Sequence, residues 1–304
     1  MSICAISTSW RAGIISNAKE LVETMKETGM RSLELEFRIS SESFENIRKN
    51  YSAWGLKIES LHAVCPSPSD RIRGAERYLI SDENEENRKR GVEHVKQTLR
   101  NAADIQAQAI ILHCGRIPSD EPIGIMKKHF DEGKINSAAA KKDIEKISSR
   151  RTALKKQNFQ SLLKSLDEIN REAEKLNIKV GLENRYYFFE FPDMEELKFI
   201  FNCFEGSNLA YWHDTGHAQV NENLFGVSQE SLLKTFNYQL IGVHLHDVLN
   251  GYHDHYAPGC GKVDFDMVKS YLKTETIRVM ELNQRVNMED AKQGIDFLKN
   301  KKLF

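Results

Sequence analysis

Residues 240–261 have the sequence LIGVHLHDVLNGYHDHYAPGCG, a β-prone apolar run followed by a loop that contains glycine, asparagine and proline. The apolar residues of the run predict a strand: Leu240, Ile241, Val243 and Leu245. Successive side chains on a strand point to opposite faces, so His244 and His246 share one face. The strand should end at Asp247, and the loop beyond it carries two more histidines, His253 and His255. Four imidazoles at the carboxyl end of one strand suggest a metal-binding rim.

Along the rest of the chain, similar short apolar, β-prone runs alternate with longer amphipathic segments. The predicted strands are residues 3–9, 32–38, 57–64, 109–114, 178–184, 208–214, 240–246 and 277–283. The predicted helices are residues 16–28 (with Ser16 as N-cap), 42–54, 83–104, 150–176, 193–203, 229–236, 264–273 and 289–299. This alternation predicts an α/β fold with a parallel sheet, and eight units predict a closed (β/α)8 TIM barrel. The alternative is an open doubly wound sheet, but the glycine-rich turn expected after its first strand is missing.

Residues 117–150 are longer than a usual connection between a strand and a helix. They contain two prolines and two glycines, followed by the charged run KKDIEKISSRR. We interpret them as a helical insertion after strand four, on the face where the strands end. The insertion is either a solvent-exposed surface helix or a lid or subunit contact. We see no change of composition that marks a second domain, so residues 1–304 are predicted to form one.

The composition argues against several classes of protein, namely nucleic-acid-binding, secreted, membrane-spanning and disulfide-rich proteins. The chain has 304 residues, of which 40% are hydrophobic and 29% charged, and its net charge is −1. This charge balance argues weakly against a dedicated nucleic-acid binder. The start of the chain does not resemble a secretory signal, and no apolar run approaches the roughly 20 residues that span a bilayer. The five cysteines are scattered without a C-x-x-C pair, so we expect no disulfide framework and a cytoplasmic location.

Acidic and imidazole side chains gather at the predicted strand ends, where a (β/α)8 barrel builds its active site. They are His62, His113, Glu183, Asp214, His217, His244, His253, His255 and Glu281. Of the ten histidines, all but His94 and His129 lie at or just beyond a strand end. Scattered core histidines would not sort in this way, so we predict one site at this face.

Carboxylates and neutral imidazoles together are typical ligands of zinc, manganese, cobalt and iron(II). One ion could be held by Glu183, Asp214, His244 and Glu281, and this oxygen-rich set favours manganese, cobalt or magnesium over a structural zinc. The remaining histidines could complete further metal sites or bind substrate hydroxyls: His62, His113, His217, His253 and His255. Asp247, Asp254 and Glu36 are candidates to accept a hydrogen bond from a metal-bound imidazole.

Several neighbouring residues have an ordinary structural explanation beside a functional one. We expect His213 to point away from the barrel interior and Asp254 to cap its loop, while His246 is either a ligand or a residue that orients one. Aromatic residues could wall a sugar-sized pocket or pack: Trp10, Tyr186, Tyr187, Phe188 and Phe189. Basic residues near the rim could recognise a phosphate or carboxylate: Arg116, Arg185, Arg285 and Lys262.

Five short motifs resemble the xylose-isomerase-like TIM-barrel superfamily. They are LEN at 182–184, HDTGH at 213–217, HLHD at 244–247, HxHxxPGxG at 253–261 and MELN at 280–283. The superfamily includes sugar phosphate isomerases and epimerases, ketose 3-epimerases, inosose isomerases and dehydratases, and endonuclease IV. The resemblance extends along essentially the whole chain. Its motifs are specific for the superfamily and less so for any one activity.

The resemblance to the epimerases implies a divalent-metal-dependent sugar or sugar-phosphate isomerase or epimerase. Two Glu, one Asp and one His hold the ion in those enzymes, and the matching positions here are Glu183, Glu281, Asp214 and His244. The two glutamates would be the acid and base that move a proton through a metal-stabilised enediolate. Arg185 and the histidines His62, His113, His217 and His253 would bind substrate, and His217 and His255 are additional candidate metal ligands.

The resemblance to endonuclease IV implies a different activity, multi-zinc phosphodiester hydrolysis at abasic DNA sites. Its three zinc ions use further ligands, which match His62, His113, His217, His253 and His255. That family has Asp-x-His where this chain has His253-Asp254-His255, and the insertion is a second departure. We therefore favour a small sugar or sugar phosphate as partner, with no membrane, and nucleic acid as the alternative. A related dehydratase or lyase, a non-catalytic metal-binding barrel and a homo-oligomer also remain open.

Overall fold

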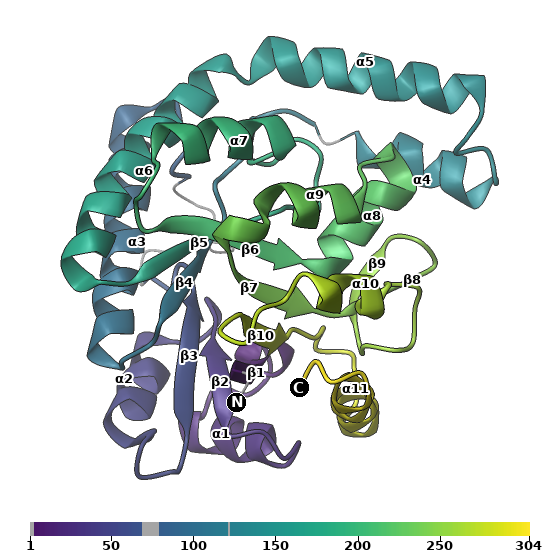
Figure 1. Cartoon of the computed structure of the whole chain (residues 1–304). Helices are drawn as coiled ribbons and strands as arrows, with labels where there is room; N and C mark the ends of the chain where they lie inside the picture. Colours follow the sequence, from purple (N-terminus) through teal and green to yellow (C-terminus); the bar gives the residue numbers. More distant parts are fainter. Residues whose placement is uncertain (1–2, 69–78, 121) are drawn as a thin grey trace.

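Eight parallel strands close into a barrel in the computed structural model, which describes residues 3–68, 79–120 and 122–304 (Figure 1). The strand order around the barrel is β1-β10-β7-β6-β5-β4-β3-β2. The strands are β1 (Ile3–Ser7), β2 (Ser32–Leu35), β3 (Lys57–His62), β4 (Ala109–Leu112), β5 (Lys179–Glu183), β6 (Leu209–Asp214), β7 (Leu240–Leu245) and β10 (Ile277–Met280). The predicted (β/α)8 barrel is confirmed.

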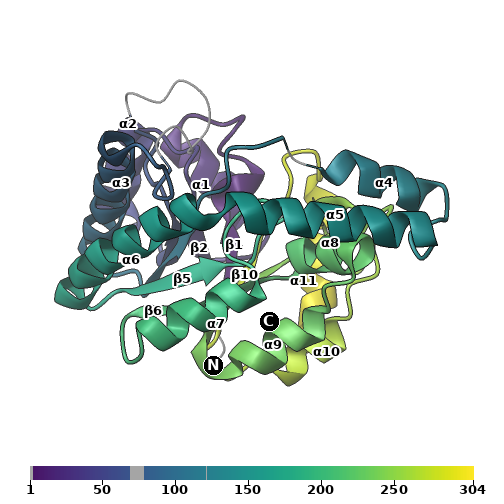
Figure 2. The same ribbon diagram turned by 90° about the horizontal axis from the view of Figure 1, so that it is seen from above.

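Helices surround the barrel on its outside (Figures 1 and 2). They are α1 (Ala18–Lys26), α2 (Ser41–Asn50), α3 (Glu85–Asp104), α4 (Ile123–Asp131), α5 (Ala138–Leu154), α6 (Lys156–Leu176), α7 (Met194–Cys203), α8 (Thr215–Phe225), α9 (Gln229–Phe236), α10 (Phe265–Ser270) and α11 (Met288–Asn300). Most bury one apolar stripe against the strands, as their periodicity predicts. The N-cap of α1 is Asn17, whose Oδ1 accepts the backbone N–H of Glu20 at 3.0 Å, and the prediction of Ser16 was wrong.

Two elements near the strand ends were not predicted. Helix α8 begins at its N-cap Asp214, and its polar sequence TGHAQVNENLF has little amphipathic pattern to reveal it. Strands β8 (Asp247–Leu249) and β9 (His253–Tyr256) form an antiparallel hairpin where a plain loop was expected. Asn250 and Gly251 turn the hairpin with φ of 50° and 80°, and such an Asn-Gly pair is itself a hairpin signal. Both elements shape the face where the barrel strands end.

The barrel interior is filled by Trp212 on β6, together with small and branched residues: Ala5, Ala109, Ile111, Ile277 and Val279. Room for the indole comes from two glycines on the neighbouring strands. A Cβ at Gly242 would lie 2.1 Å from Trp212 Cζ3, and one at Gly181 would lie 3.0 Å from Trp212 Cβ. The ring of His244 packs edge-on to this indole, with centroids 5.2 Å apart. Trp212 therefore forms an apolar layer directly beneath the polar side chains at the strand ends.

Replacing Gly242 with alanine should lower the free energy of unfolding by about 1–3 kcal/mol, because the new methyl group overpacks the barrel against Trp212. Urea unfolding followed by circular dichroism measures this change. Gly124→Ala is the matched control, since a Cβ there meets nothing within 4 Å and α4 gains helix propensity. An unchanged unfolding midpoint in the Gly242 variant would contradict the tight packing described above.

The insertion after β4 consists of α4 and α5, and α6 follows α5 directly (Figure 2). Its second helix extends to Leu154, so the predicted end at residue 150 was too early. Helix α4 lies against α8, and its last residue Asp131 accepts a hydrogen bond from the Tyr252 hydroxyl at 2.8 Å. The insertion therefore contacts the β8–β9 hairpin at the strand-end face.

Arg151 on α5 joins the insertion to the connection that follows β5. Its guanidinium donates to both carboxylate oxygens of Glu196 at 2.6 and 2.8 Å, and to the backbone carbonyls of Phe188 and Glu190 at 2.8 and 3.0 Å. Arg151 and Glu196 are 4% and 2% exposed. This buried contact fixes residues 188–190 close to the strand ends.

Replacing Arg151 with methionine should destabilise the protein by about 3 kcal/mol, because the Glu196 carboxylate loses its bidentate partner while staying buried. Lys155 remains 2.9 Å from Glu196 Oε1, which places the effect at the low end of the range for broken buried pairs. Arg171→Met is the control, since Arg171 is 71% exposed in its pair with Asp167 and should contribute well under 1 kcal/mol. Equal unfolding midpoints for the two variants would contradict the expectation.

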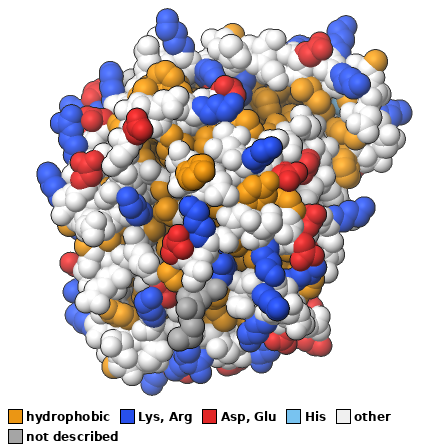
Figure 3. Space-filling model, viewed as in Figure 1, with side chains coloured by type: hydrophobic (Ala, Val, Ile, Leu, Met, Phe, Trp, Pro, Cys, Tyr) orange, Lys and Arg blue, Asp and Glu red, His pale blue; other side chains and the backbone are white. Residues whose placement is uncertain are grey.

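Acidic and basic side chains alternate over the face drawn in Figure 3, without a large region of one sign. This pattern agrees with the net charge of −1. Within the described ranges, no helix combines the length and the hydropathy that crossing a membrane requires.

Candidate metal centre

Four predicted ligands meet at the carboxyl ends of the barrel strands. Glu183 ends β5, Asp214 ends β6, His244 lies on β7, and Glu281 directly follows β10. Each offers a ligand atom within 4.8 Å of the others, and all four residues are buried. The strands that carry them are spread around the barrel, so closure of the sheet is what brings these side chains together.

The three carboxylates converge on one atom, Nδ1 of His244. That nitrogen lies 2.7 Å from Glu183 Oε1, 3.1 Å from Glu281 Oε2 and 3.6 Å from Asp214 Oδ2. Three buried carboxylates repel one another unless a cation lies between them. One nitrogen and three oxygens are also a donor set that manganese, cobalt, magnesium or zinc accepts. The residues present therefore fit a divalent ion.

The other nitrogen of His244 is held by a carboxylate that the sequence analysis missed. Nε2 lies 3.2 and 3.3 Å from the two oxygens of Glu34, and Glu34 also accepts the Ser60 hydroxyl at 2.8 Å. This contact fixes the ring orientation and leaves Nδ1 for a metal. Glu34 was detectable, because alternation along β2 places it on the inward face between Leu33 and Leu35.

Of the three residues predicted for that supporting role, Asp254 lies where the role requires, with its Oδ2 3.1 Å from His255 Nδ1, and the other two have different contacts. Asp247 accepts backbone N–H groups of Val248, Gly259 and Val263 at 3.0, 3.0 and 3.1 Å, so it shapes the loop after β7. Glu36 pairs with Arg38 at 3.2 Å. Asp254 faces the histidines of a second group.

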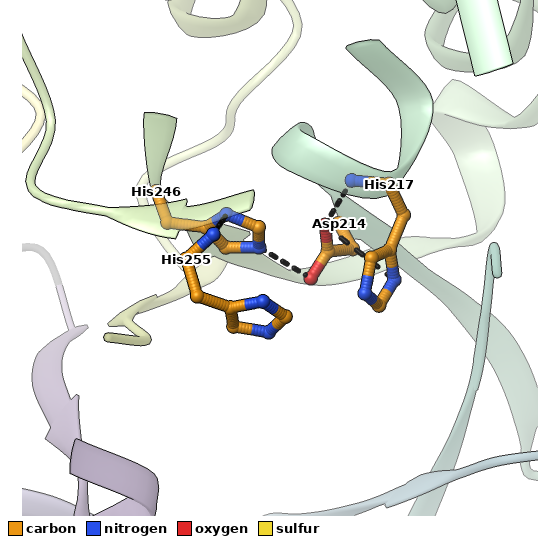
Figure 4. A group of neighbouring side chains, drawn as sticks. All are labelled: Asp214, His217, His246 and His255. Carbon is orange, nitrogen blue, oxygen red and sulfur yellow. Dashed lines mark hydrogen bonds and ion pairs between the residues drawn. The ribbon is translucent and has the colours of Figure 1, made fainter. Parts of the chain in front are cut away.

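This second group contains Asp214, His217, His246 and His255, all pointing toward one another from β6, α8, the end of β7 and β9 (Figure 4). Asp214 belongs to both groups, so the two are continuous. His217 Nδ1 lies 3.1 Å from the carbonyl oxygen of Asn184. If Nδ1 donates to that oxygen, the lone pair of Nε2 is free for a metal. His217 and His255 thus stay candidate ligands.

His246 orients the cluster through both ring nitrogens. Its Nδ1 accepts the backbone N–H of His255 at 2.9 Å, which requires the proton of a neutral ring to be on Nε2. Nε2 then donates to Asp214 Oδ2 at 2.9 Å (Figure 4). With both nitrogens engaged in this way, His246 holds Asp214 and His255 in place. The sequence had left open whether His246 is a ligand or a residue that orients one.

Asp254, and not His253, lies beside His217 and His255. Asp254 Oδ2 lies 3.1 Å from His255 Nδ1 and 3.6 Å from His217 Nε2, so its interpretation as a loop cap was wrong. His253 is exposed and packs on Tyr252, with ring centroids 4.7 Å apart. In a regular strand, side chains alternate between the two faces, so residues 253 and 255 would share one face and residue 254 would lie on the other. His255 instead has φ of 59°, and this irregularity turns Asp254 inward.

A third group joins His62 and His113 to Glu183. His113 Nε2 lies 3.1 Å from Glu183 Oε2, and the two histidine rings meet edge to face with centroids 4.5 Å apart. His62 also stacks on His244 at 5.7 Å. The imidazoles predicted at the ends of β3 and β4 therefore belong to the same cluster as the four converging ligands.

The surroundings keep the carboxylates ionised. Burial raises the pKa of Glu183, but Arg185, His113 and His244 together hold that pKa well below its usual range. Burial likewise opposes ionisation of Glu281, whose pKa nevertheless lies far below normal because His244 and His255 are adjacent. Burial and the neighbouring His113 lower the pKa of His62 to about 3. A neutral His62 beside ionised carboxylates is the state in which such groups bind metals.

A cavity of about 340 Å³ opens above the second group and forms the mouth of the site. Predicted residues that line it are Arg185, Tyr186, Tyr187, His217, His253, His255 and Arg285. Trp10, by contrast, is fully buried, with its indole N–H donating to the Val286 carbonyl at 2.7 Å. Phe189 is buried too, and Phe188 stacks on Phe225. These three aromatic residues pack, whereas the tyrosines face the mouth.

His213 is fully buried outside the barrel interior, as predicted, and its Nδ1 lies 2.7 Å from the Tyr211 hydroxyl. Tyr211 also donates to Asn184 Oδ1 at 3.0 Å, and the same oxygen accepts the Asp214 backbone N–H at 2.8 Å. Burial lowers the pKa of His213 to about 3. His213 thus helps to position Asp214 through Tyr211 and Asn184.

Comparisons with known proteins agree with this architecture. Uncharacterized protein MJ1311 of Methanocaldococcus jannaschii is 25% identical over 294 residues, covering 88% of this chain and 89% of that protein. The solved structure of a D-tagatose 3-epimerase-like protein is 20% identical with a TM-score of 0.71, covering 100% of this chain and 97% of the other. That of 3-keto-D-glucoside 4-epimerase from E. coli is 16% identical with a TM-score of 0.69, covering 99% and 100%.

The family itself is shown by a match that covers most of the chain, from α1 to the end of α11. Residues 22–301 match the family model described as xylose isomerase-like TIM barrel. The match includes every motif on which the resemblance was based, from the end of β5 to the end of β10. The chain therefore belongs to the xylose isomerase-like TIM-barrel family.

Proposed function

We propose that this protein is a divalent-metal-dependent isomerase or epimerase that acts on a sugar or sugar phosphate. The observation that carries the proposal is the approach of Glu183 and Glu281 to the same nitrogen of His244, at 2.7 and 3.1 Å. β5 and β10 are separated by β6 and β7 in the barrel, so the two carboxylates reach a substrate from different sides. The epimerases whose structures share this fold support the same class of reaction.

The mechanism rests on an acid and a base at fixed positions. One glutamate removes a carbon-bound proton beside the substrate carbonyl, and the other returns a proton to the same or a neighbouring carbon. Arg185 and His113 both contact Glu183 Oε2 and hold this carboxylate in place. A bound divalent ion would act as a Lewis acid on the substrate oxygens.

Glu281 has a different environment. Its Oε2 lies 3.6 Å from His255 Nε2, and His255 lines the mouth. Glu281 is therefore the glutamate nearer to the open cavity, which suits the residue that exchanges its proton during turnover. Arg185, His217 and His253 line the same cavity and could bind substrate hydroxyls, while His62 and His113 could do so from the inner side.

The proposal is tested by proton exchange in deuterated water over a panel of ketoses and their phosphates, with manganese or cobalt supplied. Deuterium should enter the carbon next to the carbonyl of at least one sugar, because removal and return of that proton is the reaction. NMR or mass spectrometry measures the incorporation before any product is identified. No exchange with any sugar, in protein shown to hold metal, would reject the proposal.

The additional imidazoles favour one second candidate, multi-metal phosphodiester hydrolysis. His62 and His113 on one side, and His217 and His255 on the other, could hold further ions around the shared carboxylates. Metal analysis of protein purified without chelator distinguishes the two functions. Two or three tight zinc ions per chain with cleavage of an abasic duplex indicate hydrolysis, whereas one exchangeable ion with deuterium incorporation indicates isomerisation.

A further inference from the structure

A second cavity, of about 450 Å³, adjoins the mouth of the site and is not needed for a single sugar. We call it the side groove; it lies between residues 256–260 and helix α11. Tyr256 and Arg285 line both cavities and mark their common edge. The mouth alone, at about 340 Å³, already falls within the range of about 300–1,000 Å³ that small-molecule sites occupy.

The side groove is lined by residues that lie close in the chain to Glu281 and to its neighbour His255. Tyr256 follows His255, whose Nε2 lies 3.6 Å from Glu281 Oε2. The chain that continues from Glu281 is tied to the same segment, because the Asn283 backbone N–H donates to the His255 carbonyl at 2.8 Å. Arg285 follows two residues later. A ligand whose reacting carbon lies at Glu281 can therefore extend past Tyr256 into the groove.

The walls of the groove are held in place by close backbone packing. Gly259 has φ of +95°, and a Cβ there would lie 2.7 Å from Phe297 Cδ2. A Cβ at Gly294 on α11 would lie 3.0 Å from Pro258 Cδ. The Gly259 backbone N–H also donates to Asp247 Oδ2 at 3.0 Å. These contacts fix the loop against the helix, so the cavity is part of the folded architecture.

The chemistry of the groove suits an uncharged polyhydroxylated ring. Tyr256, Pro258 and Phe297 offer apolar surfaces for the C–H faces of such a ring, and Arg285, Gln293 and Asp290 offer hydrogen-bond donors and acceptors for its hydroxyls. A phosphate would meet the carboxylate of Asp290, in the first turn of α11, as well as Arg285. One arginine beside a carboxylate does not make an anion site.

We propose that the substrate is a two-unit carbohydrate. The reacting sugar lies in the mouth and reaches inward to Glu183 and Glu281, and a second, uncharged glycosyl unit lies in the side groove. Tyr256 and Arg285 contact the linkage between them. The inference rests on the proposed function, which it deepens by naming the substrate class.

The test compares ketose disaccharides with ketose monosaccharides in the metal-loaded, full-length protein. Maltulose, isomaltulose and lactulose are the two-unit probes, and D-fructose and D-tagatose are the one-unit probes. Deuterium exchange gives kcat/KM for each, and we expect at least one disaccharide to exceed both monosaccharides by tenfold or more. Disaccharides that all exchange no faster than the monosaccharides would overturn the inference while leaving the proposed function intact.

A pair of variants on α11 assigns the effect to the groove. Gln293→Trp places an indole in the cavity, whereas Lys292→Trp places one on the exposed side of the same helix. Gln293→Trp should lower the ratio of disaccharide to monosaccharide kcat/KM at least tenfold, and Lys292→Trp should leave that ratio unchanged. Equal ratios in the two variants would count against the groove as the binding site of the second unit.

Binding without turnover separates this inference from the proposed function. Saturation-transfer NMR with the same disaccharides reports which ring contacts the protein, whether or not exchange occurs. Signals from the second ring that disappear in Gln293→Trp support the groove even if no sugar exchanges deuterium and the isomerase proposal fails. Exchange of D-fructose together with absent second-ring signals would reject the groove alone.

Discussion

Replacing Glu183 or Glu281 with glutamine should lower the rate of deuterium exchange by about 10²–10⁴-fold, the usual contribution of a general acid or base. Glutamine keeps the size of the side chain but cannot accept a proton from carbon. It also removes one negative charge from the four converging ligands, so metal content must be measured in each variant. The expected result is slow deuterium exchange by a variant that still folds and that still binds its metal ion at high metal concentration.

Glu59→Gln is a matched control for both substitutions. Glu59 is a buried barrel glutamate on β3, 2% exposed, but it contacts Ser32, Lys57 and Gln108 and not the ligand cluster. Its amide variant should change stability more than exchange. If Glu59→Gln slowed exchange as much as the other two, the loss would come from general damage to the barrel. Full exchange by Glu183→Gln and Glu281→Gln would leave no acid–base role for either residue.

Removing the metal with a chelator should abolish exchange and lower the thermal unfolding temperature. Ligand at 100 times its dissociation constant stabilises a folded protein by about 2.7 kcal/mol, which corresponds to about 4 °C for a chain of this size. Without an ion, the buried carboxylates of Glu183, Asp214 and Glu281 repel one another around His244. Adding manganese or cobalt back should restore both the rate and the unfolding temperature.

Asp214→Asn tests whether that stabilisation comes from this centre. Asp214 belongs to both the four-ligand group and the histidine group, so its loss weakens each. The variant should show little rise of unfolding temperature on metal addition, whereas wild-type protein shows the full rise. An unchanged unfolding temperature after chelation of wild-type protein, with exchange still running, would mean that these side chains hold no functional ion.

Sequence periodicity was sufficient for the architecture because a barrel repeats one local pattern. Each apolar β-prone run followed by an amphipathic helix carries its own signal, and all eight strands were found. Their carboxyl ends were placed less well. Residues 277–283 were all predicted to be strand, but β10 ends at Met280. Local β propensity could not give this end, because it depends on where pairing with β1 and β7 stops.

Elements without a repeating pattern were harder to predict. Helix α8 lacks an apolar stripe along its sequence, and strand β8 of the β8–β9 hairpin is only three residues long. Both lie at the strand-end face, where side chains serve the site more than the core. Local rules are weakest there, since residues are constrained by contacts with segments distant in the chain.

What the chain determines by itself is the order of strands and helices, the family, and the kinds of ligand atom at the strand ends. Only the tertiary structure decided which of those atoms meet. Glu34 reaches His244 across 210 positions, and Asp254 turns inward because His255 leaves the regular strand conformation. Such pairings depend on barrel closure and on single backbone angles, and neither is expressed in the spacing of residues along the chain.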